Sequence, residues 1–403
     1  MLYRLFESRR GVSLRGMSTT PGAGAVATAT LTTATLTSMS TATNSSHHAP
    51  GGGFCNPPEW GSHRDVGPID FFTRALPHWD ISTVYIPQPI ETPDFAALSR
   101  ARFAAMWLGH CTFVLALGRT RVLTDPFFSQ RASPVSFAGP SRFTPAPSRV
   151  SELPLIDVVA ISHSHYDHLD KESVRALLRA PCPPRLWVVP LGVDALLRDF
   201  GVPQTAIRAL DWWQSTTTLD GTGDGDGDGD ADAVAASEKV VFTLVPAQHG
   251  SARTMFDRNA TLWGGFYMQS SEKTVYFAGD TGYRAVEHSV APGSAAEAAA
   301  PHCPAFREMR ARLGAPDLAL LPIGAYSPRG FMSTVHASPE DALDIFDDVG
   351  AAAAIGCHFG SLPLTDERVD EPPERLARAI ERHGGESAKN FVCLRNGGLW
   401  VRD

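Results

Sequence analysis

Short apolar runs recur along the chain between residues 103 and 394, separated by glycine, proline and polar residues. Runs of about four to eight residues favour buried strands, because helices that bury an apolar face are usually longer. The expected strands are 103–109, 111–117, 121–124, 156–162, 186–190, 240–246, 262–269, 274–279, 317–324, 352–356 and 391–394.

Longer segments with apolar residues at helical spacing lie between these runs. They are residues 171–180, 192–200, 338–349 and 372–384. Ser338, followed by Pro339 and Asp341, is typical of a helix start, since the serine oxygen and the acidic side chain answer free backbone amides. A strand-rich first part, followed by strands mixed with helices, predicts two sheets covered by helices.

Composition narrows the class of protein. The chain has 403 residues, of which 43% are hydrophobic, so a large core is possible. Its formal charge of -8 argues against a nucleic-acid partner, which usually meets a basic face. The six cysteines form no CxxC pair, so neither a disulfide scaffold nor a zinc ribbon is indicated. No apolar run approaches the ~20 residues that a membrane-spanning helix requires.

Residues 1–53 differ from the rest of the chain. They carry four arginines, one glutamate and a long stretch of serine, threonine, alanine and glycine, which cannot build a core. Basic, hydroxyl-rich and nearly free of acids, this segment resembles a mitochondrial presequence. We therefore expect a disordered leader at 1–53 and a mitochondrial, membrane-associated protein; a cytoplasmic location is the alternative.

Two internal segments are predicted to be flexible insertions in a domain that spans 54–403. The first, 220–239, alternates aspartate and glycine but lacks the spaced glutamate of a calcium-binding loop. The second, 287–305, is rich in alanine. We expect both to decorate the surface.

The segment ISHSHYDHLD (161–170) concentrates metal-binding side chains directly after an apolar run. Alternation along extended backbone sends His163 and His165 to one face, and Asp167 and His168 then turn toward a neighbouring point. One short segment can therefore serve two metal ions. Imidazole and carboxylate together suit Zn²⁺ or iron.

Further ligands of the same kinds stand where later apolar runs stop. His249 follows 240–246, Asp280 follows 274–279, and His358 follows 352–356. Glycine beside each of them permits a tight turn and a close approach of metal and substrate. The sequence thus predicts a centre assembled from several strand ends.

The order HxHxDH, His, Asp, His resembles the metallo-β-lactamase superfamily. Other motifs resemble one family within it, the phospholipase D that hydrolyses N-acylphosphatidylethanolamine. They are WLGHCTFVL, LTDPFFSQRASP, GPSRF, RTMFDRNATLWGGFYM, FAGDTGY, LLPIGAYSPRGFM, HASPEDAL and DEPPERL, and the resemblance runs from about residue 54 to 400. It implies an αββα sandwich of two mixed β-sheets flanked by helices.

The resemblance also implies a ligand set and a reaction. Two Zn²⁺ per chain are expected, one held by His163, His165 and His249, the other by Asp167, His168 and His358, with Asp280 bridging both. Asp167, Asp280 and His336 are the expected catalytic residues. A hydroxide between the ions would attack phosphorus, releasing N-acylethanolamine and phosphatidic acid.

Three further residues are expected to support this chemistry. His336 matches a family histidine near the substrate phosphate and would stabilise the transition state or protonate the leaving alkoxide; a packing role is the alternative. Asp125 is expected to accept the outer N–H of a ligand histidine. His110 fits a site role and a core role equally well.

Two departures from the family pattern bear on substrate choice: Gly330 replaces a tryptophan, and the stretch after His358 reads FGSL instead of WGTF. A soluble phosphodiester or lactone therefore stays open as the substrate, and so does a metal-binding scaffold without turnover. For a phospholipid substrate we expect peripheral membrane contact, with Phe71, Phe72, Leu76 and Trp79 as candidates; ordinary core packing is the alternative for these residues. A homodimer is expected from the resemblance alone.

Overall fold

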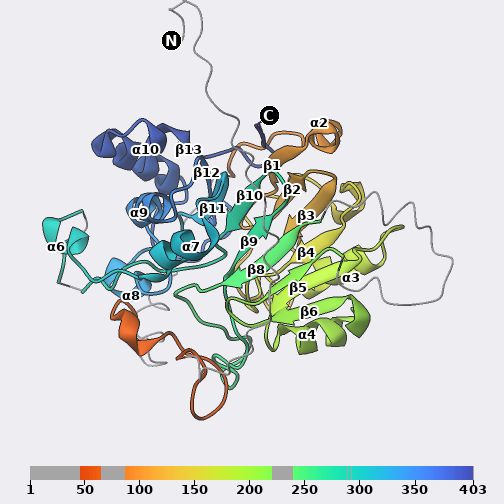
Figure 1. Cartoon of the computed structure of the whole chain (residues 1–403), viewed down its shortest axis with the longest axis horizontal. Helices are drawn as coiled ribbons and strands as arrows, with labels where there is room; N and C mark the ends of the chain where they lie inside the picture. The colour runs from red at the N-terminus through yellow and green to blue at the C-terminus, as the bar shows by residue number, and fades with distance from the viewer. Residues whose placement is uncertain (1–45, 65–86, 220–238, 288, 292, 403) are drawn as a thin grey trace, which may run out of the picture. The chain divides into compact units, whose positions relative to one another are not determined.

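Two mixed seven-stranded sheets lie at the centre of the structure, a computed structural model (Figure 1). It describes residues 46–64, 87–219, 239–287, 289–291 and 293–402. These residues belong to one unit, which runs from Asn44 to Asp403.

The first sheet combines an antiparallel half with a parallel half. In spatial order its strands are β14 (Leu399–Val401), β1 (Phe103–Trp107), β2 (Phe113–Leu117), β3 (Thr120–Thr124), β4 (Val158–Ala160), β5 (Leu186–Pro190) and β6 (Ile207–Leu210). Pairing is antiparallel from β14 to β3 and parallel from β3 to β6. The last strand of the chain thus closes the edge beside β1.

The second sheet is mixed in the same way. Its strands are β13 (Phe391–Val392), β12 (Ala354–Cys357), β11 (Leu318–Pro322), β10 (Thr274–Phe277), β9 (Gly265–Gln269), β8 (Val241–Val245) and β7 (Ser215–Thr217). Pairing is parallel from β13 to β10 and antiparallel from β10 to β7.

Helices cover the outer faces of the sheets (Figure 1). The α-helices are α2 (Phe95–Arg100), α3 (Lys171–Leu178), α4 (Val193–Phe200), α6 (Ala295–Ala298), α7 (Ala305–Leu313), α8 (Arg329–Met332), α9 (Pro339–Val349) and α10 (Glu371–His383). Short 3₁₀ turns are η1 (Pro58–Trp60), η2 (Val150–Glu152), η3 (Gln204–Ala206) and η4 (Ser387–Asn390). Ser338 caps α9 by accepting from Asp341 N–H, and Pro339 is its first residue, as the sequence predicts.

Alternation along β1 divides its side chains between two apolar layers. Phe103, Ala105 and Trp107 belong to the layer that also holds the side chains of the second sheet. Ala104 and Met106 face the opposite layer, with apolar residues of α3 and α4. Because both faces of the strand are buried, its sequence is apolar throughout. The αββα sandwich is confirmed.

The four expected helices are present as α3, α4, α9 and α10. The sequence analysis missed α2, α6, α7 and α8, and also strands β6, β7 and β14. The missed strands have only three or four residues each, too few for a periodic signal. Among the helices of the described ranges, none is long and apolar enough to cross a membrane.

Several predictions concern residues that the structure does not describe. They are the leader up to residue 45, the apolar candidates at 71–79 and the Asp-Gly run 220–238. Residues 46–53, which the sequence assigned to the disordered leader, pack instead on the domain. His47 is 4% exposed and stacks on Trp212 at 4.1 Å between ring centres. Burial of this ring offsets the entropy of ordering the segment.

The alanine-rich segment 287–305 also contacts the domain. It contains α6 and contributes Glu297, which is 7% exposed and pairs with Arg329 at 2.8 Å. A buried carboxylate requires such a partner, so the segment participates in a polar network beneath the surface.

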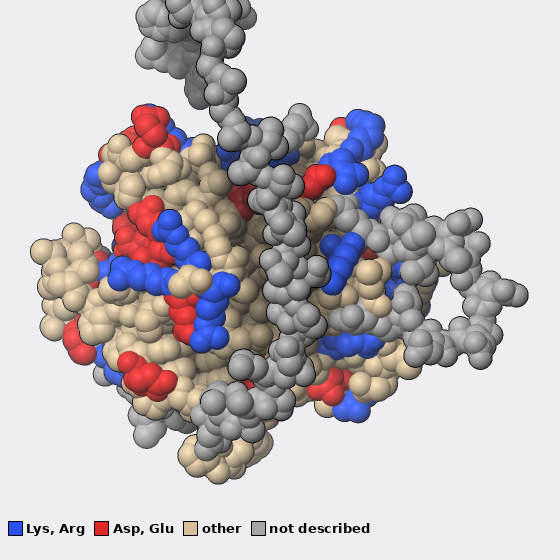
Figure 2. All heavy atoms as spheres, in the orientation of Figure 1, with Lys and Arg blue, Asp and Glu red and all other residues tan. Residues whose placement is uncertain are grey.

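Basic and acidic side chains lie close together on the face shown in Figure 2, over the region of α7, α9 and α10. Ion pairs from these helices include Arg307–Asp348 at 2.9 Å and Arg375–Glu340 at 2.8 Å. Ion pairs at exposed positions contribute about 0–1 kcal/mol each. The stability of the sandwich therefore rests mainly on its apolar layers.

Candidate metal centre

The predicted ligands lie just beyond strand ends of both sheets. His163 and His165 follow β4, His249 follows β8, Asp280 follows β10 and His358 follows β12. Donor atoms of these residues, together with Asp167 and His168, come within a few ångströms of one another. Strand ends that meet at one edge of the two sheets explain how residues almost 200 positions apart converge.

One group of donors consists of His163, His165, His249 and Asp280. Nδ1 of His165 lies 2.8 Å from Nε2 of His163 and 3.3 Å from Nε2 of His249. Nε2 atoms of His163 and His249 are each 3.7 Å from Oδ2 of Asp280. This group contains the three histidines expected to hold one ion.

A second group consists of Asp167, His168, His358 and also His110. Oδ2 of Asp167 lies 3.5 Å from Nε2 of His168 and 3.7 Å from Nε2 of His358. Asp280 reaches this group too: its Oδ2 is 3.1 Å from His168 Nε2 and its Oδ1 is 3.2 Å from His358 Nε2. Asp280 therefore lies between the groups, where a bridging ligand is expected.

Several buried donor atoms of the site have no hydrogen-bond partner among the described residues. They are Nε2 of His168, Nε2 of His358 and Oδ1 of Asp280. Leaving such atoms unpaired costs about 1–3 kcal/mol each, so the arrangement calls for a further partner. Lone pairs of imidazole and carboxylate directed at common points fit divalent cations. The residues thus suit two metal ions.

Electrostatics of the site favours cations. Burial acts to raise the pKa values of Asp167 and Asp280, but His168 outweighs it and holds both well below the usual range. The same carboxylates raise the pKa of His358 to about 10 although burial opposes its charge. A bound metal ion would replace the proton that the raised pKa places on a ligand histidine such as His358, so metal binding should release protons.

The outer nitrogens of ligand histidines are oriented by neighbouring groups. Nδ1 of His168 lies 2.7 Å from Oδ2 of Asp125, and Nδ1 of His249 lies 2.9 Å from the carbonyl oxygen of Val335. Asp125 also accepts from the backbone and side chain of Ser162, at 2.7 and 2.6 Å. Such contacts direct Nε2 toward the metal and raise ligand basicity.

His110 lies at the site. Its Nε2 is 2.9 Å from Oδ2 of Asp167, and its ring centre is 4.2 Å from that of His358. Burial, with the neighbouring His358, lowers the pKa of His110 to about 3, so its ring is neutral at pH 7. Neutral His110 can donate to Asp167 and hold that carboxylate in place.

Left-handed backbone occurs at three site residues: His110 (φ 54°), Asp125 (φ 34°) and His358 (φ 61°). Non-glycine residues in such regions cost about 1–3 kcal/mol each and persist where the surroundings impose them. Glycine serves the same purpose at Gly279 (φ 60°), where a Cβ would lie 2.5 Å from Ser162. Backbone strain therefore occurs at the turns that bring the candidate ligands and their neighbours to the metal centre.

Comparison with known proteins identifies the family. Residues 120–359 match the family described as "Beta-lactamase superfamily domain". A Caenorhabditis elegans protein named N-acyl-phosphatidylethanolamine-hydrolyzing phospholipase D 1 is 32% identical over 315 residues, which cover 77% of this chain and 78% of that protein. The chain belongs to this phospholipase D family.

Two further similarities agree with this assignment. A Saccharomyces cerevisiae relative, named as a mitochondrial N-acyl-phosphatidylethanolamine-hydrolyzing phospholipase D, is 30% identical over 81% of this chain and 62% of its own length. The structure of a possible metal-dependent hydrolase from Veillonella parvula has a TM-score of 0.51 at 16% identity, covering 75% of this chain and 100% of that one. The latter shows the fold alone. As a family member, the chain is a metal-dependent hydrolase of the phosphodiesterase class.

In this member of the family, His336 lies between the two ligand groups. Its ring centre is 5.1 Å from that of His249 and 5.2 Å from that of His358. Burial lowers its pKa to about 4, and its buried Nδ1 has no hydrogen-bond partner among the described residues. One ring nitrogen of His336 lies within 4.8 Å of donor atoms of Asp280 and His358. A neutral imidazole has one N–H to donate.

The sequence analysis missed an N-terminal strap, residues 46–64, that supports His249. Asn56 donates from Nδ2 to the carbonyl of His249 at 2.6 Å and accepts from its N–H at 3.1 Å. Next to it, Ser62 donates to Gln248 Oε1 at 2.5 Å. No pattern in FCNPPEWGSH could have revealed these contacts, because they join residues 193 and 186 positions apart.

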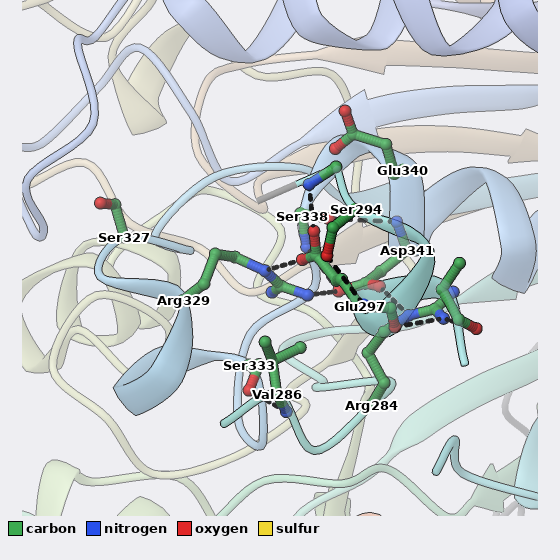
Figure 3. Close-up of polar contacts among 12 residues, drawn as sticks. Arg284, Val286, Ser294, Glu297, Ser327, Arg329, Ser333, Ser338, Glu340 and Asp341 are labelled. Carbon is green, nitrogen blue, oxygen red and sulfur yellow. Dashed lines mark hydrogen bonds and ion pairs between the residues drawn. The ribbon is translucent and has the colours of Figure 1, made fainter. Parts of the chain in front are cut away.

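Figure 3 shows a second support that the sequence does not predict, a group of polar contacts around Asp341. Arg329 donates from Nη2 to Asp341 Oδ2 at 2.7 Å, and Ser338 N–H donates to the same oxygen at 3.1 Å. Asp341 thus holds Arg329 and Ser338 together, and the loop between these two residues brings Val335 and His336 into contact with His249. We call the contacts of Asp341 with Arg329 and Ser338 the Asp341 clasp.

Buried charges complete the clasp. Arg284 donates from Nε to Asp341 Oδ1 at 2.6 Å, and Arg329 donates from Nε to Glu297 Oε1 at 2.8 Å. All four residues are buried. Arg284 also pairs with the more exposed Asp344, so two arginines meet two buried carboxylates and one half-exposed carboxylate, in a place where an unpaired buried charge is costly.

Asp341→Asn is expected to lower the free energy of unfolding by about 3–5 kcal/mol, because it leaves two buried arginines short of one carboxylate. Burial acts to raise the pKa of Asp341, but Arg329 and Arg284 hold it below its ordinary value. A depressed pKa adds stability that is lost only in acid, so the deficit should stay constant across neutral pH. Urea unfolding of the mutant and the unmodified protein measures it.

Glu340→Gln is the matched control for this prediction. Glu340 precedes Asp341 in α9, but its side chain is 29% exposed and pairs with Arg375 and Arg382, which are 14% and 62% exposed. Its loss should cost clearly less than the loss of Asp341, because water reaches this carboxylate. If both substitutions lowered the free energy of unfolding by similar amounts, the Asp341 clasp would stabilise the protein no more than the Glu340 pairs do.

Proposed function

We propose that this protein hydrolyses N-acylphosphatidylethanolamine to N-acylethanolamine and phosphatidic acid, with two Zn²⁺ per chain. The observation that carries the proposal is the position of Asp280 between two complete ligand groups, with His336 facing both. The names of the worm and yeast relatives support the substrate. Membership of the family supports cleavage of the phosphodiester bond between phosphorus and the N-acylethanolamine oxygen.

His163, His165 and His249 would hold one zinc ion, Asp167, His168 and His358 the other, and Asp280 both. When bound, the ions supply a nucleophile from water at neutral pH and offset the charge that develops on the phosphoryl group.

The chain's own residues orient the reaction. Asp125, Val335 and Ser162 set the rotations of the ligand rings through their outer nitrogens, while His110 holds Asp167. His336 is placed to donate its N–H to a phosphate oxygen or to the oxygen of the departing N-acylethanolamine.

Contact with a membrane surface is part of the proposal, because the substrate resides in a bilayer. Among the described residues, Met255 is 77% exposed and Phe256 is 93% exposed, a few positions after His249. Arg253 anchors their loop by donating to the carbonyls of Ser164 and Leu169, at 2.7 and 3.0 Å. An exposed apolar pair held next to the ligand loop is suited to enter lipid.

Location and assembly are further parts of the proposal. The yeast relative is named as mitochondrial, and the basic, acid-poor start of this chain agrees with import into that organelle. Residues 1–45 fused to a fluorescent reporter should direct it to mitochondria; a diffuse cytosolic signal would reject the proposal.

A homodimer is proposed from the resemblance to the family. Light scattering, which gives the molar mass in solution, would test it.

Product analysis tests the activity directly. Zinc-loaded protein is incubated with vesicles that contain N-acylphosphatidylethanolamine, and lipids are identified by mass spectrometry. N-acylethanolamine and phosphatidic acid in equal amounts are the expected products.

Two other outcomes correspond to the alternatives. Hydrolysis of soluble phosphodiesters or lactones without lipid cleavage would indicate a different hydrolase on the same centre. No turnover of any substrate at full zinc content would indicate a metal-binding scaffold. The first outcome would leave the metal assignment intact and reject the lipid.

A further inference from the structure

A third cluster of metal-binding side chains lies at the beginning of the N-terminal strap. Nε2 of His47 is 2.7 Å from Oδ1 of Asp211, and Nε2 of His48 is 2.8 Å from Oδ2 of the same carboxylate. One donor atom from each of the three residues lies within 4.8 Å of the other two. The spacing is comparable to that of the centre above, where neighbouring donors lie 2.8–3.7 Å apart.

Packing fixes these side chains in place. The backbone N–H of Trp212 donates to Asp211 Oδ1 at 2.8 Å, and the Asp211 N–H donates to Gln214 at 3.0 Å. The ring of His47 is stacked on Trp212, and that of His48 meets the edge of Phe54 at 5.1 Å between ring centres. The three donors are therefore oriented in advance, which a metal site requires.

The exposure of the cluster suits an exchangeable ion. His47 is buried, whereas the side chains of His48 and Asp211 are 39% and 20% exposed. An ion could thus enter from solvent and keep water as a further ligand. Two imidazoles and one carboxylate with an open position form a ligand set that zinc takes in proteins.

We propose that His47, His48 and Asp211 form a third metal site, separate from the dinuclear centre, which binds a divalent cation of the zinc class. The cation fastens the start of the strap to the loop after β6. Eight residues further along the strap, Asn56 holds His249 through two hydrogen bonds. The third site therefore secures the segment that positions a ligand of the dinuclear centre.

Equilibrium dialysis against zinc, followed by elemental analysis, tests the proposal. At saturation the unmodified protein should bind three zinc ions per chain and His48→Ala protein two. The matched control is His383→Ala, since His383 makes a surface pair with Asp347 at 2.8 Å but has no third donor in a metal-binding group among the described residues. It should bind as much zinc as the unmodified protein.

A variant of the dinuclear centre separates this proposal from the proposed function. Asp280→Ala weakens the dinuclear centre but should leave the third site able to bind one ion. Zinc should then still raise the melting temperature of Asp280→Ala protein, and adding His48→Ala should make that rise smaller; an unchanged rise would contradict the third site. Neither measurement depends on lipid hydrolysis.

Asp211→Asn provides a second test of the same cluster. The amide keeps the shape of the carboxylate and one acceptor oxygen, but it is a poor zinc ligand, so one zinc ion should again be lost. Equal zinc binding by the unmodified, His48→Ala and Asp211→Asn proteins at every free zinc concentration would overturn the proposal. The cluster would then be held by hydrogen bonds alone.

Discussion

Asp280→Ala protein is expected to contain less metal than the unmodified protein and to lose more than about 100-fold in turnover. Asp280 reaches donors of both ligand groups, within 3.1 to 3.7 Å. Loss of a residue that merely supports a ligand typically costs 10–100-fold in metal affinity or activity, and a shared ligand should cost more. Elemental analysis and a phosphodiesterase assay on the same sample measure both effects.

Asp317→Asn is the matched control. Asp280 follows β10, whereas Asp317 directly precedes β11 and accepts from Thr274 N–H at 2.9 Å, at the start of β10. Its replacement should leave metal content and turnover nearly unchanged. Full activity of Asp280→Ala protein with a single tightly bound ion would refute the dinuclear mechanism.

His336→Ala is expected to keep the fold and the metal content while turnover falls. Loss of general acid–base assistance typically costs 10²–10⁴-fold. Loss of a packing contact would act mainly through stability, at about 1–3 kcal/mol. Melting temperature, metal content and hydrolysis rate, determined together, distinguish the two roles. His302→Ala is the control, because His302 stacks on Tyr283 away from the ligand groups.

A second substrate reveals how His336 acts. An analogue with a nitrophenolate leaving group needs no proton, so a proton-donor role predicts that its hydrolysis is largely spared in His336→Ala protein. Equal loss on both substrates would indicate stabilisation of the phosphate. Unchanged turnover on both would remove His336 from the reaction.

Local patterns in the sequence predict much of the candidate site. His163, His165, Asp167 and His168 are so close in sequence that the alternation of one strand end determines which side they face. His249, Asp280 and His358 could be found because each follows an apolar run that ends in a glycine-containing turn. Ligands at strand ends thus leave a signal that a single sequence contains.

The residues that hold the candidate ligands in place cannot be recognised from local sequence in this way. Asp341 has the sequence context of a helix cap, and that role is real, yet the same carboxylate also binds Arg329 and Arg284. Glu297 belongs to a stretch whose composition suggested an insertion without partners. Burial of a charge becomes visible only when the neighbours that remove water from it are known.

The amino-acid sequence by itself determined most of the alternation of strands and helices and the capped start of α9, and it predicts the metal-binding side chains, because these depend on residues a few positions apart. Only the tertiary structure decided that β14 lies beside β1, that the strap holds His249 and that His47 meets Asp211. Such pairings join segments more than 150 residues apart. They follow from burying all apolar faces at once, a condition that no local stretch of sequence contains.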